Sequence, residues 1–281
     1  LGTHIVEGAD AFFSDIDGVL DIRGKILSIK EALIVQDNVD YHTGNIDFFG
    51  DVIIKGEVQE GFSVKAGGSV YAEHALAVKK LECGGDLCVK YGIIGRKDGL
   101  LKVGGTVKAK FMENTLVEAG GDVEILSSIL RSSLYTGGSI VCGPRGMVIG
   151  GTYFAQNGLR ANQVGSDCAP HTEIYCGLDY TVMKQLSWNK EQSLSLALAL
   201  QKIRKMTAEA QGEEKKNALI ERYAKVKDAI SKLNAISANL VFHLDKNELA
   251  SIEVTGKIYP GVNLEICHIS YVVHKTVERL G

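Results

Sequence analysis

The chain has 281 residues, of which 32 are glycine and only 3 are proline, and its formal net charge is −3. Such a composition excludes a proline-rich linker and a collagen, because collagen needs both residues in a strict three-residue period. Hydrophobic residues make up 45% and charged residues 23%, which is ordinary for a globular protein and excludes an intrinsically disordered chain. The small negative charge disfavours a nucleic-acid-binding protein, which usually has a basic domain.

Residues 1–45 are expected to form an N-terminal lead-in segment. Because the chain starts at Leu1 and not at Met, we expect it to be part of a longer protein. No uninterrupted apolar run reaches the roughly 18 residues that a transmembrane helix needs. We therefore predict no membrane span.

Gly-Gly pairs recur within residues 46–178, which hold 23 of the 32 glycines. Successive pairs begin 17, 20, 16, 17 and 13 residues apart, and similar words such as KVGGTVK and EAGGDVE surround them. The six pairs are Gly67 and Gly68, Gly84 and Gly85, Gly104 and Gly105, Gly120 and Gly121, Gly137 and Gly138, and Gly150 and Gly151. We predict that each pair forms a sharp turn between two short strands, in which glycine supplies a positive φ.

Apolar and polar residues alternate on both sides of each pair, as Val64, Ala66, Val70 and Ala72 do around Gly67. A unit this short cannot bury its own apolar face, so it must stack on copies of itself, and this predicts a β-solenoid. A left-handed solenoid needs a strict six-residue period, which is absent, so we predict a right-handed β-helix over residues 46–178. A β-sandwich, which also has many short strands, is the structural alternative.

Six cysteines are present, and their positions in the repeat separate them into groups. Cys83 and Cys142 occupy ladder positions that hold Ala or Val elsewhere, and Cys176 alternates with Ile174, so these three are expected in the core. Cys168, His171 and Cys176 have a spacing that invites a zinc interpretation, but it matches no common pattern and lacks a fourth ligand. We predict no metal and no cofactor. Free thiols in a chain of this size favour the cytoplasm.

The composition changes after Gly177, because residues 179–249 contain one glycine, Gly212, and no proline. A heptad seam with alternating spacings of four and three consists of Leu219, Tyr223, Val226, Ile230, Leu233, Ser237, Leu240 and Leu244. This spacing is typical of a coiled coil. A less regular facing stripe lies in the preceding stretch at Leu186, Leu196, Leu200 and Ile203. We predict an antiparallel coiled-coil hairpin over residues 179–249, with its tip at Gly212.

Alternation returns in residues 250–281, with a turn at Pro260 and Gly261. We expect these strands to return to the β-helix and cover its end, since an open end is a sheet edge that invites association. The predicted fold class is therefore an all-β right-handed β-helix (solenoid) with an inserted antiparallel α-helical coiled-coil hairpin.

Several segments form a combination that is more specific than any one of them. They are DYHTGNIDF at residues 40–48, GDVIIKG at 50–56, AGGDV at 119–123 and TGKIYPGV at 255–262. Together they resemble the flagellar assembly protein A family over most of the chain. The resemblance implies a cytoplasmic bacterial protein with a further N-terminal domain and a role in flagellar assembly or polar organisation. Cys168 and His171 stand where this family more often has small or neutral residues.

These features predict a non-enzymatic scaffold or interaction protein. Its partners would be flagellar or polar-localisation proteins, or further copies of itself. Candidate partner-binding residues are the basic ones in solenoid loops and beside the hairpin tip, namely Arg96, Arg145, Lys202, Arg204, Lys205, Lys215 and Lys216. A self-assembling, bactofilin-like polymer is the first alternative. A solenoid carbohydrate-active enzyme is the second, because right-handed solenoids include pectin-cleaving enzymes that use clustered carboxylates.

Overall fold

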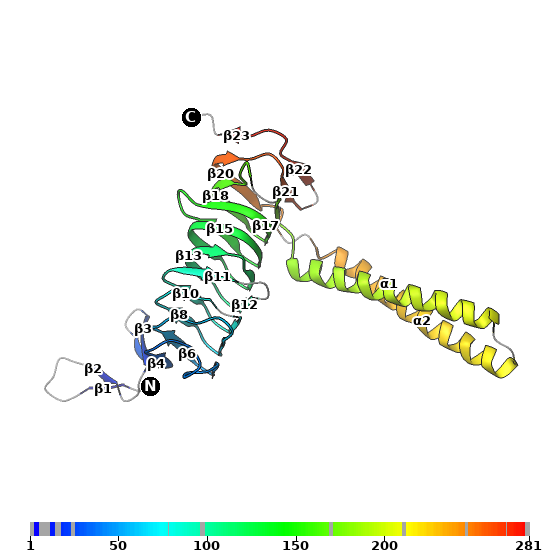
Figure 1. Cartoon of the computed structure of the whole chain (residues 1–281), viewed down its shortest axis with the longest axis horizontal. Helices are drawn as coiled ribbons and strands as arrows, with labels where there is room; N and C mark the ends of the chain where they lie inside the picture. Colours follow the sequence, from blue (N-terminus) through cyan, green and yellow to red (C-terminus); the bar gives the residue numbers. More distant parts are fainter. Residues whose placement is uncertain are drawn as a thin grey trace. The chain divides into compact units, whose positions relative to one another are not determined.

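Two units make up the chain, and each is described by itself. The computed structural model describes residues 3–5, 12–14, 18–23, 26–77, 79–95, 99–168, 171–209, 212–244, 247–267 and 269–278, with side chains from residue 32 onward. The first unit, Leu1–Gly177 with Asn247–Gly281, contains a β-solenoid, and the second, Leu178–Lys246, contains a helical hairpin (Figure 1). The predicted combination of a solenoid with an inserted pair of helices is thus confirmed.

Parallel strands form the three faces of the solenoid, and each coil contributes one rung to each face. The first face contains β4 (Ile26–Val35), β6 (Asp51–Ile54), β8 (Val70–Ala72), β10 (Leu87–Val89), the starts of β13 (Val107–Glu113) and β15 (Val123–Thr136), β16 (Ser139–Cys142), β18 (Gly158–Val164) and β20 (Ser251–Ile258). The second face is narrow and consists of single bridges at Val39, Val58 and Leu76, then β11 (Gly92–Ile94), the middle parts of β13 and β15, the start of β17 (Met147–Ala155) and the ends of β18 and β20. The third face contains β5 (Ile46–Phe48), β7 (Ser63–Ala66), β9 (Lys80–Cys83), β12 (Leu100–Val103), β14 (Leu116–Ala119), the ends of β15 and β17, β19 (Thr172–Cys176) and β21 (Val262–Ile266).

The remaining strands run antiparallel to their neighbours. Near the N-terminus, β1 (Thr3–Ile5) pairs with β2 (Phe12–Ser14), and β3 (Gly18–Arg23) pairs with the first part of β4. At the other end, β22 (Ile269–Val272) pairs with β21, and β23 (Val277–Glu278) pairs with the end of β20. The solenoid ladder begins with Ala32–Val35 of β4, earlier than the predicted start at residue 46.

Like side chains stack along the axis and fill the core. The inward ladder of the first face includes Val52, Val70, Leu87, Val107 and Val123, all with 0% exposure. Burying each of these side chains contributes about 1.5–3 kcal/mol. The alternation in the sequence therefore follows directly from a pleated strand with one face in the core.

The first five glycine pairs lie at the corner between the third face and the first, but the expected positive φ is wrong. Their glycines are all described, and none has φ in the left-handed region. The cause is a close approach between coils. A Cβ on Gly84 would lie 2.3 Å from the carbonyl oxygen of Gly67, and one on Gly104 would lie 2.2 Å from that of Gly84. Only glycine lets one corner stack this closely on the next.

In several coils the residue after the last glycine of the corner ties neighbouring coils together. Its side chain accepts a hydrogen bond from the backbone N–H of the equivalent residue in the next coil, as at Asp51, Asp86 and Asp122. Ser69 N–H donates to Asp51 Oδ1 (2.7 Å), Thr106 N–H to Asp86 Oδ1 (2.7 Å), and Ser139 N–H to Asp122 Oδ1 (2.6 Å). These aspartates thus serve the backbone of the corner.

The sixth pair, Gly150 and Gly151, occupies a different corner. Both glycines lie within β17 and have positive φ values of 67° and 103°. Because Ser132 pairs with Gly151, Gly150 falls in the rung of Arg131, which itself has a φ of 46°. This pair is therefore a turn between the second and third faces, and its different position explains the shorter spacing of 13 residues.

The helical unit consists of α1 (Tyr180–Glu209) and α2 (Glu213–Val241). The predicted seam of α2 is the less exposed side of that helix. The side of α1 that faces α2 keeps the heptad spacing more regularly than expected. Polar residues, namely Asn189, Ser193 and Thr207, occupy seam positions between the apolar ones. Asn189 is only 2% exposed, and its amide donates to Ser237 Oγ at 3.1 Å. A single buried polar pair of this kind fixes the register of two helices.

Thiol reactivity is expected to follow burial. Burial raises the pKa of Cys83, Cys142 and Cys176 to about 12, whereas Cys168 is exposed. We expect a thiol reagent to modify Cys168 in the folded protein and the three buried thiols only after unfolding. Mass mapping of the labelled peptides checks this, with Cys168→Ser as the control. Fast labelling of Cys83 in the folded protein would contradict the placement of this thiol in the core.

Candidate functional site: a groove on the first face

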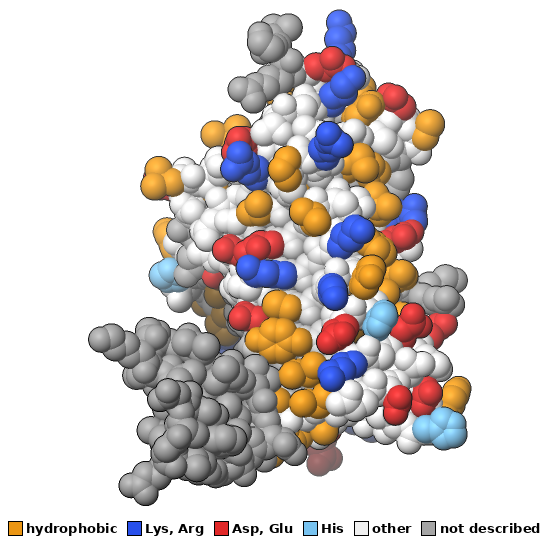
Figure 2. Space-filling model, turned by 90° about the vertical axis from the view of Figure 1, so that its left-hand side faces the viewer, with side chains coloured by type: hydrophobic (Ala, Val, Ile, Leu, Met, Phe, Trp, Pro, Cys, Tyr) orange, Lys and Arg blue, Asp and Glu red, His pale blue; other side chains and the backbone are white. Residues whose placement is uncertain are grey.

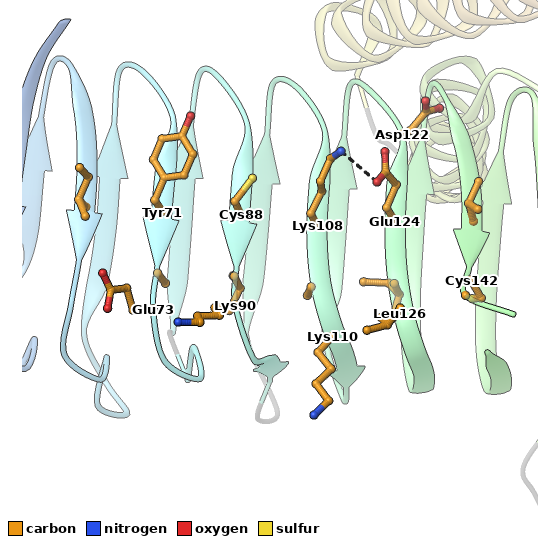
Figure 3. Close-up of a pocket in the computed structure, with 17 residues that line it drawn as sticks. Tyr71, Glu73, Cys88, Lys90, Lys108, Lys110, Asp122, Glu124, Leu126 and Cys142 are labelled. Atoms are coloured by element: carbon orange, nitrogen blue, oxygen red, sulfur yellow. Dashed lines mark ion pairs between the residues drawn. The ribbon is translucent and has the colours of Figure 1, made fainter. Parts of the chain in front are cut away.

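Two rows of outward side chains border a groove that crosses the strands of the first face. One row contains Tyr71, Cys88, Lys108 and Glu124, and the other contains Glu73, Lys90, Lys110 and Leu126 (Figure 3). The residues between the rows, such as Ala72 and Val89, point into the core, so strand backbone forms the floor. The volume of the groove is about 760 Å³, which is in the range of small-ligand and peptide sites.

Charges in the first row neutralise one another. Lys108 Nζ lies 3.0 Å from Glu124 Oε2, and this hydrogen bond raises the pKa of Lys108. Asp122 accepts the Ser139 N–H. Lys90 and Lys110 in the second row are exposed, and their ammonium groups form no ion pair within the described residues. These two lysines are therefore free to meet a carboxylate.

Exposed apolar side chains accompany the charges in the groove. The exposed fractions are 38% for Tyr71, 62% for Leu126 and 37% for Val141. Figure 2 shows a face of the solenoid on which hydrophobic side chains form a band, with charged side chains beside it. Burial, followed by the charge of Asp86, raises the pKa of Cys88, so this thiol stays protonated near neutral pH and is a poor nucleophile. The groove thus has the chemistry of a binding surface.

The third face carries an outward ladder of a different kind. Lys65 Nζ lies 3.2 Å from Asp47 Oδ2, and three aromatic rings follow further along the axis. The ring centroids of Tyr135 and Phe154 are 5.2 Å apart, and those of Phe154 and Tyr175 are 4.5 Å apart, with the planes nearly parallel. Both faces of Phe154 are therefore covered by its neighbours, so this ring has no free face for a sugar to stack on.

Five outward carboxylates of the described coils are each engaged by the architecture. Asp51, Asp86 and Asp122 accept backbone N–H groups. Glu113 pairs with Arg131, and Glu253 lies 3.3 Å from Arg160. These carboxylates are spread over many coils and engaged in the architecture.

No group of three potential metal ligands occurs among the residues that the structure describes. The sequence candidates for zinc point in different directions. Cys176 is fully buried in the core, whereas Cys168 and His171 are exposed. His171 Nε2 lies 3.5 Å from Glu173 Oε1. A shared metal would require Cys176 to leave the core.

The predicted partner-binding residues that the structure describes belong to two separate units. Arg96 lies outside the described residues. Arg145 is exposed in the turn before β17. The hairpin residues are exposed near the ends of their helices, at Lys202, Arg204, Lys205, Lys215 and Lys216.

Sequence reasoning missed the groove residues. Their signal is a fixed distance from the glycine pair. Tyr71, Cys88 and Lys108 each stand three residues after the second glycine, while Lys90 and Lys110 stand five residues after it. Superposing the repeats on their glycines would have placed these side chains in two rows.

The comparisons with known proteins agree with this architecture. Residues 31–280 match the model of the flagellar assembly protein A β-solenoid domain. Neither the curated proteins nor the solved structures yield a match. Within the described residues, no helix combines the length and the apolar character needed to cross a membrane. The chain belongs to the flagellar assembly protein A β-solenoid domain family.

Proposed function

We propose that this protein is a non-enzymatic cytoplasmic scaffold for bacterial flagellar assembly or polar organisation. Membership of the flagellar assembly family carries this proposal. The solenoid acts as a rigid body, because every coil is held to the next by backbone ladders and stacked core residues. Such a body can hold docking surfaces at fixed separations.

A binding role agrees with the chemistry of the outer faces. A hydrolytic site would need an acid and a base close together on one strip. Among the described residues, the carboxyl groups whose pKa shifts clearly have a lowered pKa. For Glu82 the main cause is a hydrogen bond from Lys80. A catalytic acid needs a raised pKa. We therefore favour docking over catalysis.

The groove is the proposed docking surface on the solenoid. Its occupant is a protein segment that presents an apolar side chain and a carboxylate. The apolar side chain would pack on Leu126 or on Tyr71, which lie three coils apart, and the carboxylate would meet Lys90 or Lys110 between them. The basic residues near the hairpin tip, from Lys202 to Lys216, form a second proposed surface for acidic protein segments.

Charge reversal in the groove is expected to weaken partner binding. In pull-downs from the native bacterium with the full-length protein, Lys90→Glu/Lys110→Glu should retain about a tenth or less of the partner, because two favourable charge pairs become repulsive. Lys79→Glu/Lys102→Glu, on the third face, is the matched control with the same change in net charge. Equal retention by the two double variants would show that the groove is not the docking surface.

Polymerisation by continued parallel coils is less favoured than docking. At the C-terminal end, β22 and β23 run antiparallel to the coil strands. A further coil in the same direction cannot continue the parallel ladder across them. Association at this end of the solenoid would therefore need contacts other than further parallel coils.

A further inference from the structure

The core is only partly covered at the C-terminal end of the solenoid. In the preceding coil, Leu159, Val164 and Ile174 are 2%, 0% and 1% exposed. Their partners in the last coil, Ile252, Ile258 and Leu264, pack against the core but are only partly buried. The inward ladders thus reach the end of the solenoid without a full apolar cover.

The strand at this end adds further apolar surface. Ile269, Tyr271 and Val272 of β22 are 80%, 58% and 43% exposed. Ile269 pairs with Ile266, and Tyr271 pairs with Leu264. Cross-strand partners project to the same side of a sheet, so Ile269 and Tyr271 extend the half-open core face.

The outer edge of β22 is free for strand pairing. Within the described residues, β22 pairs with β21 alone. Val273 N–H donates to the carbonyl oxygen of Val262 at 2.9 Å, so the backbone groups of odd-numbered residues in this strand point towards β21. Those of Ser270 and Val272 therefore point outward. The strand has no charged residue and no proline, the usual means of blocking an exposed edge.

We propose that this end face is a self-association surface, on which a second copy of the chain pairs its own β22 antiparallel to the first. A two-fold axis beside Tyr271 would place Ser270 opposite Val272 of the second copy, with their outward backbone groups hydrogen-bonded. Tyr271 of each copy would then face its counterpart in a non-hydrogen-bonded pair. The occupant is a second copy because β22 carries no charge that an identical strand would repel, and because the two-fold axis provides both the antiparallel direction and an equal apolar face.

A charge at the centre of this surface tests the proposal. Analytical ultracentrifugation of the purified chain should show a monomer–dimer equilibrium. Tyr271→Asp should weaken dimerisation roughly 100-fold, because symmetry places two carboxylates in the buried contact. Phe49→Asp, at another exposed aromatic residue (73% exposed), is the matched control and should leave the equilibrium unchanged. Thermal unfolding of both variants verifies that they fold.

Disulfide trapping checks the geometry independently. In a Cys168→Ser background, Tyr271→Cys should form an interchain disulfide on mild oxidation. Non-hydrogen-bonded partners have Cα atoms about 4.5 Å apart, within the range that a disulfide spans. Phe49→Cys should form no interchain disulfide under the same conditions. A wild-type chain that is monomeric at its solubility limit, or a dimer that persists in Tyr271→Asp, would overturn the proposal. A stable complex with another protein through β22, but none between copies, would do so as well.

Discussion

Replacing Gly104 by alanine is expected to lower the free energy of unfolding by about 3 kcal/mol, the upper end of the usual cost of overpacking. The new Cβ would lie 2.2 Å from the carbonyl oxygen of Gly84, and the backbone of both residues is held in a ladder of hydrogen bonds. Gly104 N–H donates to the carbonyl oxygen of Cys83 at 2.9 Å, and Gly120 N–H to that of Val103, also at 2.9 Å. The corner therefore cannot move away without breaking hydrogen bonds to the coils above and below.

Two other glycines of the same corner provide a graded control. The nearest atoms to an added Cβ are 2.9 Å away at Gly137 and 3.1 Å away at Gly121. Neither glycine has a positive φ, so alanine there meets a milder clash and no backbone strain. Urea unfolding followed by circular dichroism should rank Gly104→Ala as the least stable variant. Equal stability of all three variants would mean that crowding between coils does not select glycine at this corner.

The glycine corner also shows what a sequence can and cannot predict. A regular spacing and the flanking alternation are sufficient for a solenoid, because only stacked coils give the same residue the same neighbours in every repeat. The reason for glycine is different, since a positive φ and a close approach both select it. Gly150 needs the positive φ and Gly104 needs the close approach, although both belong to Gly-Gly pairs. Only the pairing of rungs distinguishes the two cases.

Polar residues at seam positions limited the prediction of the hairpin. The seam of α2 is mostly apolar and visible as a heptad pattern. In α1, Asn189 and Ser193 interrupt the apolar pattern, so that stripe looked irregular. The hydrogen bond from Asn189 to Ser237 explains the interruption, but a contact across 48 residues cannot be inferred from local periodicity.

Charge alone was a poor guide to the candidate site. The sequence singled out basic residues in loops and at the hairpin tip, where they form local clusters. Lys90 and Lys110 are 20 residues apart and look like ordinary surface lysines. They become part of one groove because they occupy the same position in successive coils, next to Leu126. Long-range register decides this, and it is fixed only when the coils are stacked.

Alkaline pH is expected to destabilise the solenoid through its buried thiols. Burial raises the pKa of Cys83, Cys142 and Cys176 from 9.0 to about 12. Between these values the unfolded chain loses the thiol protons while the folded chain keeps them. The unfolded state then binds fewer protons, so stability falls as pH rises through this window. Each thiol can contribute a loss of about 4 kcal/mol once the pH reaches the upper limit.

Alanine replacements isolate this effect, because the ladders already hold alanine beside each thiol. Ala66 pairs with Cys83 and Ala155 pairs with Cys176, and Ala161 directly follows Arg160, the partner of the residue before Cys142. The triple alanine variant should be less stable than wild type at neutral pH, since it loses buried sulfur atoms, yet its stability should fall less steeply above pH 9. Burial also raises the pKa of Tyr153, so Tyr153→Phe measures the share that this phenol contributes. If the triple variant kept the full alkaline slope of the wild type, the buried thiols would not be its cause.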